Sequence, residues 1–366
     1  MMLRRCWKRL LGNRTARPRR GTDHVLSAAE FRRLTERERM RSDRGGSVFC
    51  VLAIQFIEKA LSPDNERELG GLIRSRVRLT DDAGWLDDGR LGLLLPETDS
   101  TGARKVARDL ADRLEGRFGF TRIECFEHPE RRPLTEVGEP EMTGTWEGRG
   151  DSGVSRNVLP ISALLSAPIP SWKRAMDLAC ASAGLAVISP FLVVVAAAIK
   201  ATSPGPVFFV QWREGYAGRR FRMFKFRTMR VGADRIQHRY RAMSEQDGPA
   251  FKLRDDPRVT WIGHLLRKSC VDELPQLINV IRGDMSLVGP RPLPVAESLV
   301  CEGWQRRRLD VVPGLTCDWQ ANGGPRVTFD EWMRMDLRYA RRIALGRDLA
   351  LLAKTFLAVA TFRASH

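Results

Sequence analysis

The chain has 366 residues, a formal net charge of +17 and 43% hydrophobic residues. This length is enough for two domains, because single domains usually run about 100–200 residues. A basic chain suits a nucleic acid, an anionic lipid or a phosphate-bearing substrate. The seven cysteines are scattered and never stand in CxxC spacing. This argues against a zinc site and a disulfide framework, so we expect a reducing, cytosolic setting.

The basic residues are concentrated in two parts of the chain. The first 20 residues hold eight arginines and lysines and no acidic residue. Residues 51–150 carry 15 basic against 20 acidic side chains, whereas residues 151–366 carry 32 against 19. We treat residues 1–22 as a basic arm. Its Leu-Leu pair is followed at once by polar residues, so it lacks the apolar core of a signal peptide and we expect no secretion signal.

Residues 23–126 alternate between strand and helix patterns. Ser27 and Glu30 have the spacing of a capping box that opens a charged helix, and Asp88-Gly89 suits the turn of a hairpin. The later pattern predicts a strand at 47–57, a helix at 65–77, a hairpin at 84–97, a helix at 102–116 and a strand at 118–126. This βαββαβ order behind a lead-in helix predicts an α+β domain of the ferredoxin-like type.

The segment RVRLTDDAGWLDDGRLGLLLPETDSTGARKVARDL, within this element order, resembles the GGDEF nucleotide-cyclase domain over residues 30–126. At the turn that carries the Gly-Gly-Asp-Glu-Phe signature of that family, this chain reads DDGRL. The glycines that approach the nucleotide and the acidic pair after them are not in place. Asp87 and Asp88 could mimic a metal pair, but a solvated turn is the simpler interpretation. We expect a degenerate domain without cyclase activity, in a regulatory or assembly role.

A predicted linker leads into the most apolar segment of the chain. Residues 127–170 are rich in Pro, Gly, Glu and Ser and show no sustained apolar period, which predicts the linker. Residues 178–199 then contain no charge, and as a straight helix they would extend about 33 Å, enough to span a bilayer core. The segment is apolar on every face, unlike a helix of a soluble protein. The sequence therefore predicts a membrane protein.

Two features of this segment favour a re-entrant hairpin. Ser189-Pro190 interrupts its middle, where proline removes a backbone hydrogen bond and kinks a helix. Lys173 and Arg174 precede the segment and Lys200 follows it, so both ends prefer the cytoplasmic face. A helix–break–helix hairpin that enters one leaflet and returns satisfies both features. The alternative is a transmembrane helix with a proline kink.

A second apolar segment lies near the C-terminus. Residues 348–362 are interrupted by Lys354 and are short for a membrane span. They predict an amphipathic helix that lies on the membrane or packs against the first apolar helix. A core helix is an equally good interpretation.

Cations and an acidic pair follow the first apolar segment. Residues 203–230 place two apolar-aromatic runs around Gly215 and Gly218, which predicts a β-hairpin. Basic side chains gather at its end and before the acidic pair: Lys225, Arg227, Arg230, Arg258, Arg267 and Lys268. The pair itself, Asp272-Glu273, belongs to the stretch CVDELPQLINVIRGDMSLVGPRP.

The acidic pair allows two interpretations. Pro275 suits the first turn of a short helix that Gly283 ends, which places Asp272 and Glu273 at a helix N-terminus. One carboxylate can attack phosphorus while the other holds Mg²⁺. Alternatively the pair caps the helix, since Ser269 and Asp272 have the S-x-x-D spacing. The glycine-bounded stretch that carries Arg291, a forked donor suited to phosphate, favours phosphate chemistry, as does a second such loop at residues 313–323.

Residues 171–366 resemble the bacterial sugar transferase family, the monotopic polyprenyl-phosphate phosphoglycosyl transferases. The motifs that carry the resemblance stand in family order: KRAMDL, the Ser-Pro break, GPVFFVQWREGYAGRRFRMFKFRTM, DPRVTWIGHLLRKS, VDELPQLINVIRGDMSLVGPRP, PGLTCDWQANG, TFDEW and DLRYA. The resemblance implies a re-entrant membrane helix at about 174–200 with a small, mostly helical cytosolic catalytic domain.

The resemblance also implies an activity. Sugar-1-phosphate passes from a nucleotide sugar, usually a UDP-sugar, to polyprenyl (undecaprenyl) phosphate, with release of UMP, at the cytoplasmic face of the bacterial inner membrane. This is the first membrane step of exopolysaccharide, O-antigen, capsule or glycoconjugate synthesis. By motif, Asp272 is the nucleophile that forms an aspartyl-phosphosugar intermediate and Glu273 helps to hold Mg²⁺. The implied phosphate contacts are Lys225, Arg227 and Arg267, with Arg291 on the nucleotide side.

The sequence departs from the family pattern in one loop. The family usually continues with Asn-Gly-Arg or Ser-Gly-Arg, whereas here Asn322 is followed by Gly-Gly-Pro and Arg326, which we expect to take over the contact two positions later. Cys317 and Asp318 replace a common glycine and a small or apolar residue. The sequence does not fix the sugar, and it leaves open a homo-oligomer and a regulator of the N-terminal domain.

Two other classes of function remain as alternatives. One is a membrane-anchored signalling protein whose GGDEF-like domain binds a nucleotide. The other is a nucleic-acid-binding protein, but no helix-turn-helix, zinc or RNP-type pattern supports it, so we expect no nucleic-acid partner.

Overall fold

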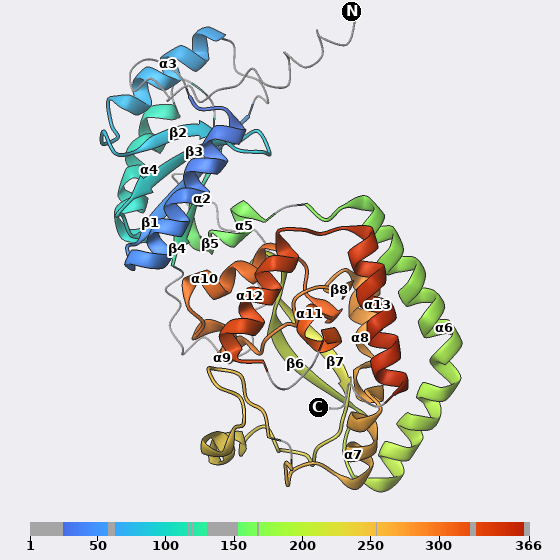
Figure 1. The fold of residues 1–366 in the computed structure, drawn as a ribbon. Coiled ribbons are helices and arrows are strands. Elements are labelled where there is room, and N and C mark those ends of the chain that lie inside the picture. Colours follow the sequence, from blue (N-terminus) through green and yellow to red (C-terminus); the bar gives the residue numbers. More distant parts are fainter. Residues whose placement is uncertain are drawn as a thin grey trace, which may run out of the picture.

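The structure, a computed structural model, describes residues 25–57, 63–115, 118, 120–129, 153–166, 168–253, 255–322 and 327–361. The predicted basic arm, most of the predicted linker and Arg326 lie outside these described residues. Figure 1 shows an N-terminal unit built around one sheet and a larger C-terminal unit along which the long helix α6 runs.

The N-terminal unit is a five-stranded sheet with the strand order β2-β3-β1-β4-β5. Its first four strands in that order pair antiparallel, and β5 pairs parallel with β4. The strands are β1 (Phe49–Phe56), β2 (Asp82–Trp85), β3 (Leu91–Pro96), β4 (Phe120–His128) and β5 (Val154–Pro160). The helices are α2 (Ala28–Gly45), α3 (Pro63–Arg74), α4 (Ser100–Leu114) and α5 (Ser162–Leu165). The predicted βαββαβ order is confirmed, with a ferredoxin-like arrangement of its four strands.

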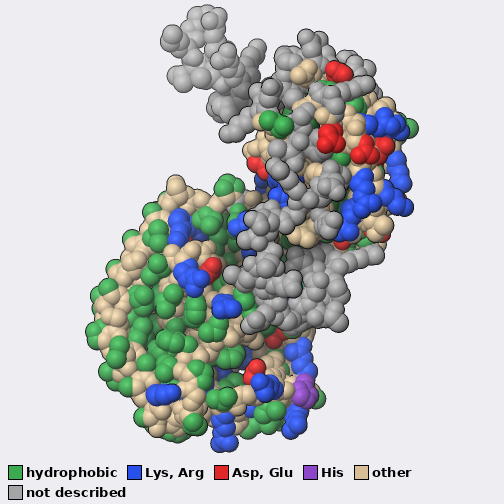
Figure 2. All heavy atoms as spheres, turned by 180° about the vertical axis from the view of Figure 1, so that it is seen from behind, with side chains coloured by type: hydrophobic (Ala, Val, Ile, Leu, Met, Phe, Trp, Pro, Cys, Tyr) green, Lys and Arg blue, Asp and Glu red, His purple; other side chains and the backbone are tan. Residues whose placement is uncertain are grey.

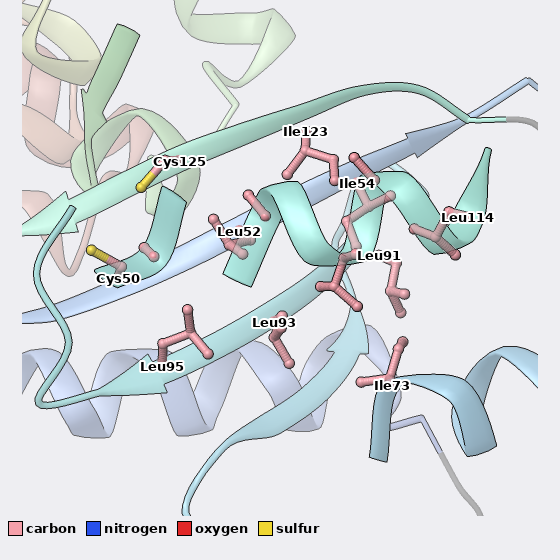
Figure 3. Close-up of a cluster of buried hydrophobic side chains, with 14 of the residues drawn as sticks. Cys50, Leu52, Ile54, Ile73, Leu91, Leu93, Leu95, Leu114, Ile123 and Cys125 are labelled. Atoms are coloured by element: carbon pink, nitrogen blue, oxygen red, sulfur yellow. The ribbon is translucent and has the colours of Figure 1, made fainter. Parts of the chain in front are cut away.

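Both faces of this sheet are covered. Side chains along β1 point alternately to the two faces, so this strand contributes to a buried cluster on each face. Leu52 and Ile54 belong to a buried cluster with Leu110 of α4 and Ile73 of α3, part of which Figure 3 shows. Phe49, Val51 and Ala53 belong to a second cluster, which includes Phe31 of α2 and Leu165 of α5. The capping box between Ser27 and Glu30 at the start of α2 is confirmed.

The predicted linker is wrong at its C-terminal end. Residues 154–160 form β5, whose Val158 pairs with Cys125 of β4, and α5 follows at once. The apolar pattern of residues 154–160 is weak because β5 is an edge strand with several polar residues. What stabilises β5 is its pairing with β4, which the local sequence does not show.

The C-terminal unit contains many short elements and is mostly helical. A hairpin of β6 (Phe208–Glu214) and β7 (Arg220–Phe226) confirms the predicted one, and β8 (Ser286–Val288) pairs parallel with β9 (Gly314–Thr316). The α-helices are α6 (Ser171–Thr202), α7 (Trp261–Lys268), α8 (Gln276–Arg282), α9 (Val295–Leu299), α10 (Gly303–Arg306), α11 (Asp318–Asn322), α12 (Phe329–Ala340) and α13 (Leu345–Ala360). The 3-10 segments are η2 (Tyr216–Gly218), η3 (Gln237–Met243), η4 (Val271–Glu273) and η5 (Arg307–Asp310).

Helix α6 is continuous where a helix–break–helix hairpin was predicted. It contains Pro190 and curves around the outside of the C-terminal unit. Proline leaves the carbonyl of Ala186 without its helical donor. The hydroxyl of Ser189 donates to that carbonyl at 2.9 Å. Because Ser189 supplies this bond, the helix passes Pro190 without ending.

The outer face of α6 is apolar and exposed. Val187 is 80% exposed, and Phe191, Val193 and Val194 are also exposed. Figure 2 shows hydrophobic side chains gathered over this side of the C-terminal unit. By length and composition α6 could cross a membrane. On α13, Phe356 is exposed as well, while other side chains of that helix are buried, as expected for an amphipathic helix.

The cations before the apolar segment anchor α6 to the C-terminal unit. Lys173, only 2% exposed, forms an ion pair with Asp348 of α13 and donates to the hydroxyl of Tyr339 at 3.0 Å. Arg174 donates to the last carbonyls of α8. Asp177 accepts from the backbone nitrogen of Leu287 at 2.9 Å. Lys173 is therefore buried and Arg174 half-buried against the C-terminal unit, contrary to the expectation that both flank a membrane segment as interfacial cations.

Candidate active site

The acidic pair lies in a tight connection between α7 and α8. Cys270, with φ of 55°, turns the chain out of α7, and Asp272 and Glu273 follow on η4. The predicted helix start at Pro275 and its end at Gly283, with φ of 90°, are confirmed. Both carboxylates are 8% exposed.

Glu273 is held by cations from two other segments. Lys225, on β7, donates from Nζ to Glu273 Oε1 at 2.8 Å. Arg291, after β8, donates from Nη1 to Oε2 at 3.4 Å and from Nη2 to Oε1. The three side chains line a cavity of about 620 Å³ together with Asp272 and Arg267. With Arg227, which also lines it, the structure brings six of the predicted site residues to one cavity.

The charges in this cavity perturb one another. Burial raises the pKa of Asp272 to about 6, against the opposing effect of Lys225, and the neighbouring Glu273 raises it further. Burial lowers the pKa of Lys225 and of Arg267. Burial also acts to lower the pKa of Arg291, but the Glu273 carboxylate outweighs it, so that this pKa is raised. A carboxylate with a raised pKa beside fixed cations is typical of catalytic sites.

The interpretation of the acidic pair as a helix cap is wrong. Pro275 is the N-cap of α8, and no side chain in the part of the chain that the structure describes caps it. The hydroxyl of Ser269 donates back to the carbonyls of Leu265 and Leu266, at 2.9 and 3.2 Å, at the end of α7. Asp272 is therefore available to the cavity.

The other predicted phosphate contacts are placed differently. Arg267 lines the cavity, and its Nε donates to Thr228 Oγ1 at 3.0 Å. Arg227 also lines it, but its terminal nitrogens donate to the carbonyls of Ser203 and Pro204, which fixes the connection between α6 and β6. Arg326 lies outside the described residues.

Glycines allow the loops of the site to stack closely. A Cβ on Gly289 would lie 2.4 Å from the carbonyl oxygen of Val312, and one on Gly314 would lie 2.0 Å from the nitrogen of Gly289. The two glycine-bounded loops predicted from the sequence therefore pack against each other beside β8 and β9. Likewise a Cβ on Gly263 would lie 2.0 Å from the carbonyl oxygen of Thr228. The glycine therefore lets α7 approach Thr228 closely enough for the Arg267 side chain to contact it.

Two arginines at the site, the half-buried Arg213 and the buried Arg308, were not predicted from the sequence. Arg213 of β6 lines the cavity and donates to the carbonyl of Pro292 at 2.9 Å. Arg308 of η5 donates to the carbonyl of Arg291 and pairs with Asp336 of α12 at 2.9 Å. Both belong to runs of charged residues in which periodicity does not show which side chain turns inward.

The unusual residues of the second loop lie in separate contacts. Asp318 pairs with Arg347 of α13, and Lys354 donates to Asn322 Oδ1 at 2.7 Å. Cys317 is buried. These side chains join α11 to α13 and do not touch the acidic pair.

The DDGRL turn of the N-terminal unit has its carboxylates paired with arginines. Asp87 pairs with Arg32 at 2.5 Å, and Asp88 pairs with Arg90 at 2.7 Å. Arg90 also contacts Glu124 at 2.6 Å. This supports a solvated, ion-paired turn over a metal pair.

The family model of bacterial sugar transferases matches residues 169–362, from just before α6 to just after α13. The chain belongs to the bacterial sugar transferase family. Its relatives include the galactosyl transferase CpsE of Streptococcus agalactiae, 40% identical over 62% of this chain and 49% of the relative. The exopolysaccharide production protein ExoY of Sinorhizobium fredii is 37% identical over 53% of this chain and 88% of the relative.

A further relative is the UDP-glucose:undecaprenyl-phosphate glucose-1-phosphate transferase of Escherichia coli, 36% identical over 54% of this chain and 43% of the relative. The chain thus spans about half or less of CpsE and the Escherichia coli protein, but most of ExoY. A solved DGC protein from Thermotoga maritima is 19% identical, with a TM-score of 0.25, over 30% of this chain and 85% of that one. A likeness of this size supports no conclusion about function.

Proposed function

We propose that this chain transfers sugar-1-phosphate from a UDP-sugar to polyprenyl phosphate, releasing UMP, at the cytoplasmic face of the bacterial inner membrane. The observation that carries the proposal is Asp272, a buried carboxylate in a cavity with Lys225, Arg267 and Arg291, beside an exposed apolar helix. The names of the relatives, which include undecaprenyl-phosphate glucose and galactose phosphotransferases, support it.

The reaction proceeds in two displacements at phosphorus. A carboxylate oxygen of Asp272 attacks the sugar-bearing phosphorus, the bond from that phosphorus to the UMP oxygen breaks, and UMP leaves with the electron pair. An oxygen of polyprenyl phosphate then attacks the same phosphorus and releases the Asp272 carboxylate. With a pKa of about 6, Asp272 is mostly ionised at neutral pH and needs no general base. The two anionic substrates react in turn and need not meet directly.

The cations offset charge in both displacements. Lys225 and Arg291 bind Glu273 and also line the cavity, so the phosphate oxygens of a substrate come within reach of donors that are already positioned. Arg267 adds a third positive charge on the α7 side. Preorganised donors stabilise the developing charge without reorganising during the reaction.

The acidic pair fits a Mg²⁺ ion. Among the residues that the structure describes, no group of three or more His, Cys, Asp or Glu side chains gathers. Mg²⁺ does not need one, because it usually takes one or two carboxylates together with waters and substrate phosphates. Glu273 would hold the ion together with waters and substrate phosphate oxygens. When bound, Mg²⁺ offsets the negative charge of the diphosphate.

The position of α6 supports insertion into one leaflet. Its first turns are fixed by Lys173 and Asp177, and its last turns, through Val195 and Ile199, pack with Phe226 and α7. Both ends therefore contact the same unit. If α6 crossed the bilayer as a straight span, the C-terminal unit, which contacts both ends of α6 and carries many charges, would lie inside the hydrocarbon, which is about 30 Å thick. A helix that bends at Pro190 and returns both ends to the cytoplasmic side avoids this.

The substitution Asp272→Asn tests the proposal. It keeps the shape of the side chain and removes the nucleophile, so UMP release from a panel of UDP-sugars with membrane-borne polyprenyl phosphate should fall at least about 1000-fold. The exposed Asp255→Asn is the matched control and should keep the wild-type rate. A wild-type rate in Asp272→Asn would contradict the assignment of the nucleophile.

A further inference from the structure

The 3-10 segment η5 contacts the two units of the molecule on opposite sides. Arg307 and Asp310 face the N-terminal unit, whereas Arg308 between them turns inward toward the active site. This segment comes directly before the loop that contains Gly314, so it connects the N-terminal unit to a loop of the site.

The outward contacts are ion pairs with α2, each between a buried side chain of α2 and a partly exposed side chain of η5. Arg39 Nη1 lies 2.7 Å from Asp310 Oδ2, and Arg307 Nε lies 2.9 Å from Asp43 Oδ2. Asp43 also contacts His128 of β4 at 2.8 Å. The fit is close, since a Cβ on Gly303 of α10 would lie 2.6 Å from Asp43 Oδ1. Breaking one partner of a buried pair leaves an uncompensated charge, so this docked arrangement is sensitive to single substitutions.

The inward contacts hold the backbone of Arg291. The Arg308 guanidinium, 4% exposed, donates to the carbonyl of Arg291 and pairs with Asp336 Oδ2 at 2.9 Å. It also lies over the ring of Trp332, 5.6 Å from its centre. The side chain of Arg291 in turn binds Glu273. The ion pairs with α2, the backbone of η5, the Arg308 contact with the Arg291 carbonyl and the Arg291 pair with Glu273 therefore join α2 of the N-terminal unit to the acidic pair.

We propose that Arg308 is a positioning residue for Arg291, and that the N-terminal unit controls the affinity of the site for its nucleotide sugar by holding η5 in place. This inference rests on the proposed function and on the placement of Arg291 at the nucleotide side of the substrate, which the family resemblance implies. The N-terminal unit then acts through docking alone and needs no nucleotide of its own. When α2 and η5 separate, Arg308 shifts, the carbonyl of Arg291 loses its donor, and the UDP-sugar binds more weakly.

A charge exchange in the full-length chain tests the coupling. Arg39→Asp and Asp310→Arg should each raise KM for the UDP-sugar about 10-fold, and the double variant, which restores an ion pair in reverse, should return KM to within about threefold of wild type. KM for polyprenyl phosphate should stay within about twofold. Arg37→Asp, on the exposed face of α2, is the matched control. Asp43→Asn, which keeps its shape, serves as a milder second variant.

Arg308→Lys tests the positioning role directly. One nitrogen of Arg308, Nη2, contacts both Asp336 and the Arg291 carbonyl. Lysine keeps a positive charge near Asp336, but its shorter side chain and compact ammonium do not reach the position of Nη2. KM for the UDP-sugar should rise about 10-fold while kcat stays within about threefold. A merely structural role would lower the active fraction, and hence kcat, without a selective change in KM, and that result would overturn the proposal.

Hydrogen exchange separates this inference from the proposed function. Backbone amides in residues 286–291 should exchange faster in Arg39→Asp than in Arg37→Asp, whether or not a UDP-sugar is turned over. Unchanged exchange there overturns the inference even in an active enzyme. If the exchange changes but wild type releases no UMP from any UDP-sugar, the coupling stands and the proposed function fails.

Discussion

The two units of this molecule differ in where they bury charged side chains. The sheet of the N-terminal unit is filled on both faces by apolar residues such as Leu52 and Phe49, and its buried Arg39 pairs with η5 of the other unit. The C-terminal unit buries charges in contacts within itself, among them Lys173, Asp272 and Arg308. Burying a charge is unfavourable unless it is paired, so such residues indicate anchoring or chemistry rather than general stability.

Within the C-terminal unit, two buried charge networks differ in one respect. Lys173 and Asp348 are enclosed, and their hydrogen bonds are made to the protein itself. Lys225 and Glu273 face the cavity of about 620 Å³. The first network joins the two apolar helices, whereas the second is open to a ligand. Substitutions should therefore separate the two: the first governs stability and the second governs activity.

The largest effect on stability is expected for Lys173→Met. Among the described residues it leaves the buried Asp348 with only the hydroxyl of Tyr339 as a side-chain donor, and the free energy of unfolding should fall by about 3–5 kcal/mol. The double variant Lys173→Met with Asp348→Leu removes both charges and should recover most of that loss. Denaturant unfolding of the full chain in detergent measures both. If the single variant is as stable as wild type, the enclosed network is not an anchor.

An intermediate effect is expected from pH. Because burial raises the pKa of Asp272 to about 6, the carboxyl gains a proton as the pH falls through 6 and can no longer attack phosphorus. The rate of UMP release should fall about tenfold per pH unit below 6 and level off above it. Lys225 lowers the pKa of Asp272, so Lys225→Met should move the midpoint to higher pH as well as slow the reaction. A midpoint near pH 4 in wild type would contradict this account.

The sequence predicted those parts of the fold whose signals are local. The strand pattern at 47–57, the capping box at Ser27 and the glycine at 283 each act within a few residues. The strand β5 was missed because its partner is distant, and the continuity of α6 was missed because one hydroxyl, that of Ser189, compensates for Pro190.

The same distinction applies to the candidate site. Asp272, Glu273 and Arg291 stand in motifs, so the sequence predicted them. Arg308 and Asp336 meet from segments far apart in the chain, and in Arg306-Arg307-Arg308 nothing local marks the arginine that turns inward. Contacts between distant segments are what a single sequence does not show.

The smallest effect is expected at the pair of Asp318 with Arg347, which is partly exposed. Solvent screens such a pair, so Asp318→Ala should lower the free energy of unfolding by less than about 1 kcal/mol and leave UMP release within about twofold. Asp318→Arg, which places like charges together, should cost more, and Asp318→Arg with Arg347→Asp should restore the wild-type value. Thermal unfolding and UMP release measure these effects in the same samples. A large loss of activity in Asp318→Ala would show that this loop belongs to the catalytic network. It would contradict the division between charges that govern stability and charges that govern activity.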